Sequence, residues 1–87
     1  MKITYYVYVL RSKKGSKCYI GSTSDLDRRI KDHNLGKVPS TISRRPLELI
    51  YFEKFETREL AEKRERFFKT VDGRSVLEKL LSASARR

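Results

Sequence analysis

The chain has 87 residues, of which 21 are Lys or Arg, 11 are Asp or Glu and one is Cys, and its formal net charge is +10. This length predicts a single domain, residues 1–87, and the lone cysteine excludes an internal disulfide and a thiolate zinc cluster, which suits a reducing cytoplasm. The charge favours a polyanionic partner, nucleic acid first, over a membrane, because no segment pairs a wide apolar face with a basic one.

Three segments have the composition of β-strands. Residues 3–11, ITYYVYVLR, are β-branched and aromatic on both alternating faces, which is typical of a strand covered on both sides. They also hold the longest apolar run, which is too short to span a bilayer. After the polar turn SKKGSK, residues 18–21 predict a second strand that ends at Gly21 and forms a hairpin with the first. Within it we expect Cys18 to be a small core residue rather than a nucleophile. Residues 47–55, LELIYFEKF, predict the third strand.

The first helix is predicted between the second and third strands. Ser24 and Asp27, three residues apart, have the spacing of a capping box at its start. The helix is expected to end near Asn34, with Gly36 closing it. A basic loop, residues 37–46, KVPSTISRRP, then leads to the third strand.

Two helices are predicted after the third strand. Thr57 can cap a helix over residues 58–70, Gly73 is expected to break it, and residues 75–81 form a short last helix before a frayed tail, residues 82–87. The order of elements is therefore β, β, α, β, α, α. It predicts an α/β fold with a small central three-stranded sheet, antiparallel or mixed, flanked by helices.

Helical geometry separates two adjacent arginines of the first helix. At about 100° per residue, Leu26, Ile30 and His33 share a narrow apolar arc. Arg29 lies at the border of this arc and Arg28 lies roughly opposite it. We therefore expect Arg29 to lie against the edge of the sheet and Arg28 to point to water.

The same projection of the next helix leaves one carboxylate beside its buried face. Glu65 lies about 40° beyond Ala61, whereas Glu59 and Glu62 fall on the far face. One carboxylate of the three is thus predicted at the margin of the core. The buried arc itself is expected to contain Leu60, Ala61, Phe67 and Phe68.

Four features in this order resemble the GIY-YIG nuclease domain: Tyr8, the tripeptide Tyr19–Gly21, Arg29 and Glu65. The resemblance runs from about residue 6 to residue 69, and is nearest to small standalone members related to the catalytic module of the nucleotide-excision-repair incision nuclease. The tripeptide YVY stands where Gly-Ile-Tyr would, and only the last tyrosine carries chemistry in that family. Arg29 follows Gly21 by eight residues, as the catalytic arginine of the family does.

The resemblance implies a divalent-metal-dependent endonuclease that hydrolyses phosphodiester bonds in DNA. Glu65 would anchor one Mg²⁺ or Mn²⁺, since Mg²⁺ is usually bound by only one or two carboxylates. Arg29 would present its fork of donors to the phosphate. Tyr8, with its pKa lowered by cationic neighbours, would orient or deprotonate water, and Tyr19 would hydrogen-bond beside it. His33 is the further catalytic candidate, although packing on the helix explains it equally well.

Candidate contacts to the DNA backbone lie in the turns and in the basic loop. Gly21 would let the substrate backbone approach closely, where a side chain would obstruct it. Hydroxyl residues could serve only as turn residues, and the loop could be a solvated connection, but the net charge favours a DNA clamp. The nucleic-acid-binding candidates are Gly21, Ser22, Thr23, Lys37, Ser40, Thr41, Arg44 and Arg45.

The rival interpretation is a nucleic-acid-binding module of the same fold that cleaves nothing. Binding alone would not need a carboxylate at the margin of the core, because a carboxylate repels phosphate. Larger members of the family join this module to a recognition domain, and no residues are left over here for that part. We therefore expect low sequence specificity, unless a protein partner or a homodimer supplies it.

Overall fold

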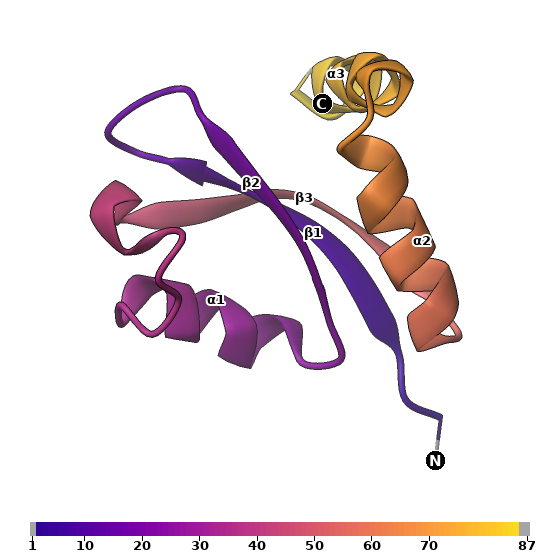
Figure 1. The fold of residues 1–87 in the computed structure, drawn as a ribbon, viewed down its shortest axis with the longest axis horizontal. Coiled ribbons are helices and arrows are strands. Elements are labelled where there is room, and N and C mark those ends of the chain that lie inside the picture. Colours follow the sequence, from indigo (N-terminus) through magenta and orange to yellow (C-terminus); the bar gives the residue numbers. More distant parts are fainter. Residues whose placement is uncertain (1, 86–87) are drawn as a thin grey trace.

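The computed structural model describes residues 2–85, which form a three-stranded sheet with helices packed on both of its faces (Figure 1). The fold is α/β, as predicted, and the order ββαβαα is confirmed. The elements are β1 (Tyr5–Ser12), β2 (Cys18–Thr23), α1 (Leu26–Asn34), the 3-10 turn η1 (Ile42–Arg44), β3 (Leu47–Phe55), α2 (Arg58–Phe68) and α3 (Val71–Ala85).

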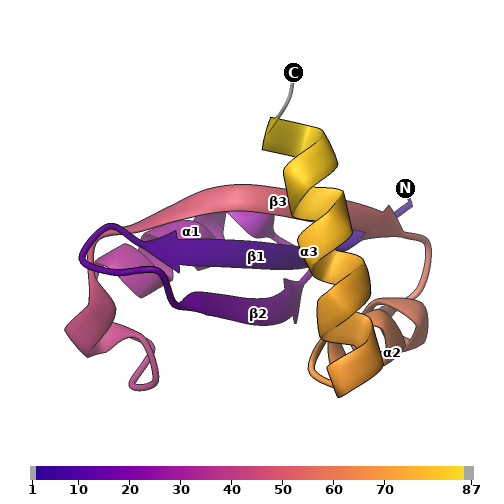
Figure 2. The same cartoon turned by 90° about the horizontal axis from the view of Figure 1, so that it is seen from above.

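The sheet has the order β2-β1-β3, and both pairings are antiparallel. Tyr8 lies opposite Gly21 on one side and opposite Phe52 on the other, and the β1–β3 register shifts between Val9 and Leu10. Figure 2 shows β1 between its two neighbours, with α3 crossing one face and α1 behind the other. The central position explains why β1 is covered on both faces, as its composition predicts.

Alternate residues of β1 enter two separate cores. Val7 and Val9 face α2 and α3, where they contact Ala61, Phe68 and Leu77. Tyr8 and Leu10 face α1, in a cluster that also holds Leu47 and the half-buried Tyr19, Leu26, Ile30 and Leu49. Because successive side chains of a strand point to opposite faces, this alternation decides which face of the sheet holds the tyrosine.

The first helix begins one residue later than its capping pattern predicts. Asp25, not Ser24, is the N-cap, and its carboxylate accepts a hydrogen bond of 3.2 Å from the backbone N–H of Arg28. The reason is that β2 continues through Thr23, two residues past Gly21, which moves the turn along the chain. Gly36 closes the helix with a φ of 80°, as expected of a glycine at this position.

The second helix has the predicted cap but a different end. Thr57 accepts a hydrogen bond of 3.2 Å from the N–H of Leu60. The break falls at Lys69, and Gly73 lies inside α3, so its prediction as the helix breaker is wrong. A Cβ at Gly73 would collide with the carbonyl oxygen of Phe67, so its lack of a side chain allows the two helices to meet closely. The predicted frayed tail is helical up to Ala85, and the remainder of it lies outside the described residues.

Two predicted core positions are wrong. Cys18 is exposed, because it opens an edge strand that has a neighbour on one side only. Leu60 is 50% exposed although the next residue, Ala61, is buried, so the buried face of α2 does not include Leu60. None of the helices within residues 2–85 combines the length and the apolar composition that a membrane crossing requires.

An ion pair fastens α2 to β3. Arg64 donates from Nε and Nη2 to the two carboxylate oxygens of Glu53, at 2.8 and 3.2 Å, and the hydroxyl of Tyr51 donates to the same carboxylate at 2.5 Å. The guanidinium also lies 4.4 Å from the ring centroid of Phe68. Because Glu65 is the next residue along the helix, this pair also holds the part of α2 that carries Glu65.

Candidate active site

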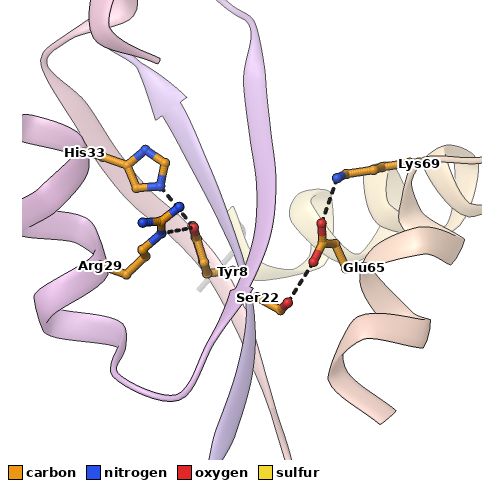
Figure 3. A network of polar contacts seen from close by, with 6 residues as sticks. All are labelled: Tyr8, Ser22, Arg29, His33, Glu65 and Lys69. Carbon is orange, nitrogen blue, oxygen red and sulfur yellow. Dashed lines mark hydrogen bonds and ion pairs between the residues drawn. The ribbon is translucent and has the colours of Figure 1, made fainter. Parts of the chain in front are cut away.

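Three polar side chains meet beneath β2 on the α1 face of the sheet (Figure 3). The hydroxyl of Tyr8 lies 2.9 Å from Nε2 of His33, and Nε of Arg29 donates to the Tyr8 oxygen at 3.4 Å. The ring of Tyr19 lies 4.8 Å from the His33 ring and 6.2 Å from the Tyr8 ring, between centroids. The sequence predicts Arg29 inward and Arg28 outward, and in the structure Arg29 is half-buried and Arg28 exposed.

His33 is held on its other side by the loop after α1. Its Nδ1 lies 2.7 Å from the hydroxyl oxygen of Thr41, which donates to the backbone carbonyl of Val38 at 3.4 Å. His33 and Thr41 are fully buried. The sequence position of Thr41 suggested a surface contact to DNA. The structure does not support this, because the loop folds the Thr41 side chain inward against α1.

Burial moves the pKa of Tyr8 in the direction opposite to the one predicted. The hydroxyl is covered, with Tyr8 only 1% exposed, and desolvation raises its pKa from 10.0 to about 12 although Arg29 opposes the shift. The pKa of His33 is lowered from 6.5, first by burial and then by the positive charge of Arg29, while Asp32 opposes this. The pair at rest is thus a neutral phenol beside a neutral imidazole.

Gly21 makes room for Tyr8 rather than for substrate. A Cβ at this position would lie 2.5 Å from the Tyr8 hydroxyl oxygen and 3.0 Å from a ring carbon of Tyr19. The phenol of Tyr8 fills the space above the glycine, so the predicted gap for a phosphate backbone is wrong. Glycine is instead required at this position because a side chain would collide with Tyr8.

Glu65 lies across β2 from Tyr8 (Figure 3). Ser22 donates from its hydroxyl to Oε1 of Glu65 at 2.7 Å, and Nζ of Lys69 contacts Oε2 at 2.7 Å. The Glu65 side chain is 22% exposed, and its charge is near enough to contribute to the raised pKa of Tyr8. β2 thus lies between the tyrosine, arginine and histidine on the α1 face of the sheet and the carboxylate on the α2 face (Figure 3).

The donor set fits a hydrated divalent cation held by one carboxylate. Within residues 2–85, no group of three or more His, Cys, Asp or Glu side chains could hold a metal ion. Mg²⁺ needs no such group, because it keeps several waters and takes one or two carboxylates from the protein. Glu65 offers such a carboxylate with the Ser22 hydroxyl beside it, provided that Lys69, whose side chain is 51% exposed, releases Oε2.

The predicted DNA contacts are spread along the β2 edge and the basic loop. The hydroxyl of Thr23 is used locally, since it accepts from the N–H of Asp25 at 3.1 Å. Lys37 is exposed and lies 3.9 Å from Asp32, and Ser40 is exposed. Arg44 and Arg45 are half-buried, and Nε of Arg45 donates to the carbonyl of Ile42 at 2.9 Å.

Sequence reasoning missed Lys69 at this site and a basic hollow elsewhere on the molecule. Lys69 follows Glu65 by four positions, the helical spacing that places two side chains together, so that signal was present. Lys17 and Arg74 line a hollow of about 590 Å³ together with Arg44, between the hairpin turn and α3, and no local pattern announces it.

Comparisons with known proteins address the family and the fold of the chain. The family model described as the GIY-YIG catalytic domain matches residues 4–78. UPF0213 protein CPE1444 of Clostridium perfringens is 40% identical over 80 residues, which cover 91% of this chain and 85% of that protein. UPF0213 protein YazA of Bacillus subtilis is 44% identical over 68 residues, 77% of this chain and 68% of that protein. The solution NMR structure of UPF0213 protein BH0048 from Bacillus halodurans is similar with a TM-score of 0.54 and 35% identity, covering 88% of this chain and 84% of that one.

Proposed function

Because the chain belongs to the GIY-YIG catalytic domain family, we propose that residues 1–87 act as one endonuclease domain that hydrolyses phosphodiester bonds in DNA. One observation carries the proposal. The hydroxyl of Tyr8 is bonded to both Arg29 and His33, and the carboxylate of Glu65 lies just across the edge strand. A phosphate at this edge would meet an acid–base pair, a guanidinium and an anchor for a cation.

Arg29 is the phosphate clamp in this proposal. Its bond to Tyr8 is long at 3.4 Å and its side chain is half-buried, so a phosphate can draw the guanidinium outward with two stronger, charged hydrogen bonds. That movement uncovers the Tyr8 hydroxyl for water. Arg29 stays protonated throughout, because the pKa of a guanidinium is far above neutral pH. At rest its hydrogen bond to Tyr8 raises that pKa further.

Tyr8 is the group that takes a proton from water, and His33 is the group that frees it to do so. A phenol with a pKa of about 12 is a poor base at neutral pH. When the Tyr8 O–H bond breaks, its proton passes to Nε2 of His33 over the 2.9 Å contact. The phenolate then accepts a proton from the water whose oxygen attacks phosphorus, and the leaving oxygen takes a proton from solvent. Tyr8 finally releases a proton to solvent and takes back the one held by His33, which restores the neutral pair and balances the protons. Tyr19 packs its ring beside the pair and helps to hold the two rings in place.

Glu65 would hold one Mg²⁺ or Mn²⁺ ion. A bound divalent ion supplies positive charge for the phosphate oxygens and lowers the pKa of its water. Ser22 orients the carboxylate from one side, and Lys69 balances its charge until a cation takes the place of the ammonium group. The negative charge of Glu65 also adds to the raised pKa of Tyr8, an effect that a cation on Glu65 would weaken.

DNA is the proposed polyanion because of the net charge of +10. Exposed Lys37 and Ser40 and half-buried Arg44 and Arg45 lie on the loop beside the site and serve as the clamp on the backbone. None of these contacts reads a base, so a protein partner or a second copy of the chain would supply any specificity. A reducing cytoplasm is the proposed setting, which suits the exposed thiol of Cys18.

A non-cleaving nucleic-acid-binding module is the second candidate. Two observations favour it: Tyr8 is covered, and Lys69 neutralises Glu65. In such a module the carboxylate would serve only to order the end of α2.

Nicking of supercoiled plasmid DNA, with and without Mg²⁺ or Mn²⁺, separates the two candidates. We expect metal-dependent conversion to the open circle, blocked by a chelator and restored by added metal. DNA binding with no nicking of any DNA form in either metal would reject the nuclease and favour the binding module. Cleavage of single-stranded RNA, measured under the same conditions, tests the choice of DNA.

A further inference from the structure

The hydrogen bonds around His33 form one chain that runs from α1 to the loop after it. Nε of Arg29 donates to the Tyr8 oxygen, Tyr8 contacts Nε2 of His33, and Nδ1 of His33 contacts Thr41. The hydroxyl of Thr41 then donates to the carbonyl of Val38. Each of the three middle groups can both donate and accept, so an end group has to decide the direction of the chain.

The Arg29 end sets the direction. The guanidinium of Arg29 can only donate, so the Tyr8 oxygen accepts there and its own proton points to Nε2 of His33. In the reverse direction the Tyr8 proton would have no acceptor among the described residues. With Nε2 as an acceptor, a neutral His33 carries its hydrogen on Nδ1 and donates to the Thr41 oxygen, and the hydroxyl proton of Thr41 is then directed to the carbonyl of Val38. The Val38 end is consistent with this direction but does not require it, because its carbonyl also accepts from the N–H of Thr41 at 3.1 Å.

We propose that Thr41 is a positioning residue that holds His33 as its Nδ1–H tautomer, so that Nε2 is the acceptor for the proton of Tyr8. In the other tautomer Nε2 would carry hydrogen and donate to Tyr8, and the phenol proton would have no acceptor among the described residues. The catalytic consequence rests on the proposed nuclease function. The tautomer itself does not.

The hydrogen-bond pattern also accommodates the charged state that follows proton transfer, while burial and the charge of Arg29 oppose that state. An imidazolium donates from both nitrogens, to the phenolate through Nε2 and to Thr41 through Nδ1, so no side chain has to rotate. The groups that face the ring are Tyr8 and Tyr19 from the strands and Arg29 and Asp32 from α1. From the loop, Thr41 also contacts the ring of His33. Its hydroxyl is neutral and fully buried, away from any phosphate.

The sequence contains a single histidine, which makes the tautomer directly measurable. We would label His with ¹⁵N, remove any affinity tag, and record the ring nitrogen shifts without metal or DNA at a pH above the titration of His33. Three variants are compared with the parent: Thr41→Val, which keeps the shape and loses the hydroxyl, Thr41→Ser, which keeps the hydroxyl, and Ser43→Ala, a control at an exposed hydroxyl of the same loop. Nicking rate, metal-free DNA affinity and melting temperature are measured in parallel.

We expect the Nδ1–H tautomer in the parent, Thr41→Ser and Ser43→Ala, and its loss in Thr41→Val. The nicking rate of Thr41→Val should fall about 10- to 100-fold, as when a group that orients a functional histidine is removed, with little change in DNA affinity. A parent with the Nε2–H tautomer, or a folded Thr41→Val with the tautomer and rate of the parent, overturns the inference. If the parent nicks no DNA, the nuclease proposal fails, whereas the tautomer of the parent still decides the role of Thr41 even where Thr41→Val does not fold.

Discussion

Tyr8 lies directly opposite Gly21 in the β1–β2 ladder, and a Cβ at Gly21 would stand 2.5 Å from the Tyr8 hydroxyl oxygen. The second half of the motif is therefore coupled to the first by packing. Gly21 allows the phenol to lie flat against β2, where Arg29 and His33 reach its oxygen. A side chain at residue 21 would act on the site through Tyr8.

Gly21→Ala should destabilise the fold by about 1–3 kcal/mol, the usual cost of forcing an extra group into a packed site, and should reduce nicking because the phenol is displaced. Gly15→Ala is the control, since a Cβ there meets no atom within 4 Å. Urea unfolding and plasmid nicking measure the two effects. Equal stability of the two variants would show that β2 shifts to make room for the methyl group and that Gly21 does not constrain Tyr8.

Arg29→Ala should lower the cleavage rate by about 10²-fold or more, with only a modest loss of DNA affinity. The reason is that the guanidinium donors act on charge that develops in the transition state. Arg28→Ala, at the exposed neighbouring position, should cleave like the parent. The pKa of His33, measured by NMR, should rise in Arg29→Ala alone, since the guanidinium charge that lowers it is gone. Similar catalytic defects in both variants would contradict the assigned roles.

Tyr8→Phe removes one hydroxyl and should lower the nicking rate by about 10²-fold or more, the scale of a positioned acid or base. A stability loss of about 1–3 kcal/mol should accompany it, because Nε2 of His33 loses its buried partner. Tyr6→Phe is the matched control on the same strand, since the Tyr6 hydroxyl makes no hydrogen bond within residues 2–85 and its ring packs edge-on to Phe52. A fully active Tyr8→Phe protein would remove this residue from the mechanism.

Glu65→Gln should keep the fold, bind DNA at least as well without metal, and lose Mg²⁺-dependent cleavage. The physical reason is that the carboxylate repels phosphate unless a cation lies between them. Glu62→Gln, one turn earlier on α2, should behave like the parent. For the parent and both variants we would measure the nicking rate across a Mg²⁺ titration and the DNA affinity without metal. Undiminished nicking by Glu65→Gln would reject Glu65 as the metal anchor.

Glu53 should make the stability of the fold depend on acid pH. Burial opposes its ionisation, but the hydrogen bonds from Arg64 and Tyr51 and the charge of Arg64 outweigh burial and lower its pKa below the ordinary 4.5. A lowered pKa in the folded state means that the stabilisation is complete above about pH 4.5 and is lost as the pH falls through the folded-state pKa.

Glu53→Gln should therefore be less stable than the parent by about 1–3 kcal/mol at pH 7, and the difference should shrink as the pH falls below 4.5. Glu48→Gln is the control, because its pair with Arg11 is exposed, at 42% and 50%, and should contribute less than about 1 kcal/mol. Urea unfolding from pH 7 to pH 3 tests both variants. A difference between Glu53→Gln and the parent that stays constant across this range would rule out the ion pair as its cause.

The sequence by itself determined the elements, their order and the facing of Arg28 and Arg29. The third strand at residues 47–55, the cap at Thr57 and the split between Arg28 and Arg29 all match the structure. These features depend on periodicity and on hydrogen bonds between residues three or four positions apart, so a short stretch of chain contains all the information. The motif residues predicted the family through their order along the chain, while their roles in catalysis remain predictions.

Only the tertiary structure decided which polar atoms meet. Ser22 and Glu65 are 43 residues apart, and Tyr8 and His33 are 25 apart, so their contacts depend on the order of the strands and on where each helix packs. The same long-range packing buries Thr41 and raises the pKa of Tyr8. A side chain in an isolated segment would be solvated by water. In the folded protein, distant parts of the chain remove that water, so the buried hydroxyls must find partners in one another and form a directed hydrogen-bond chain. No local sequence pattern encodes this desolvation.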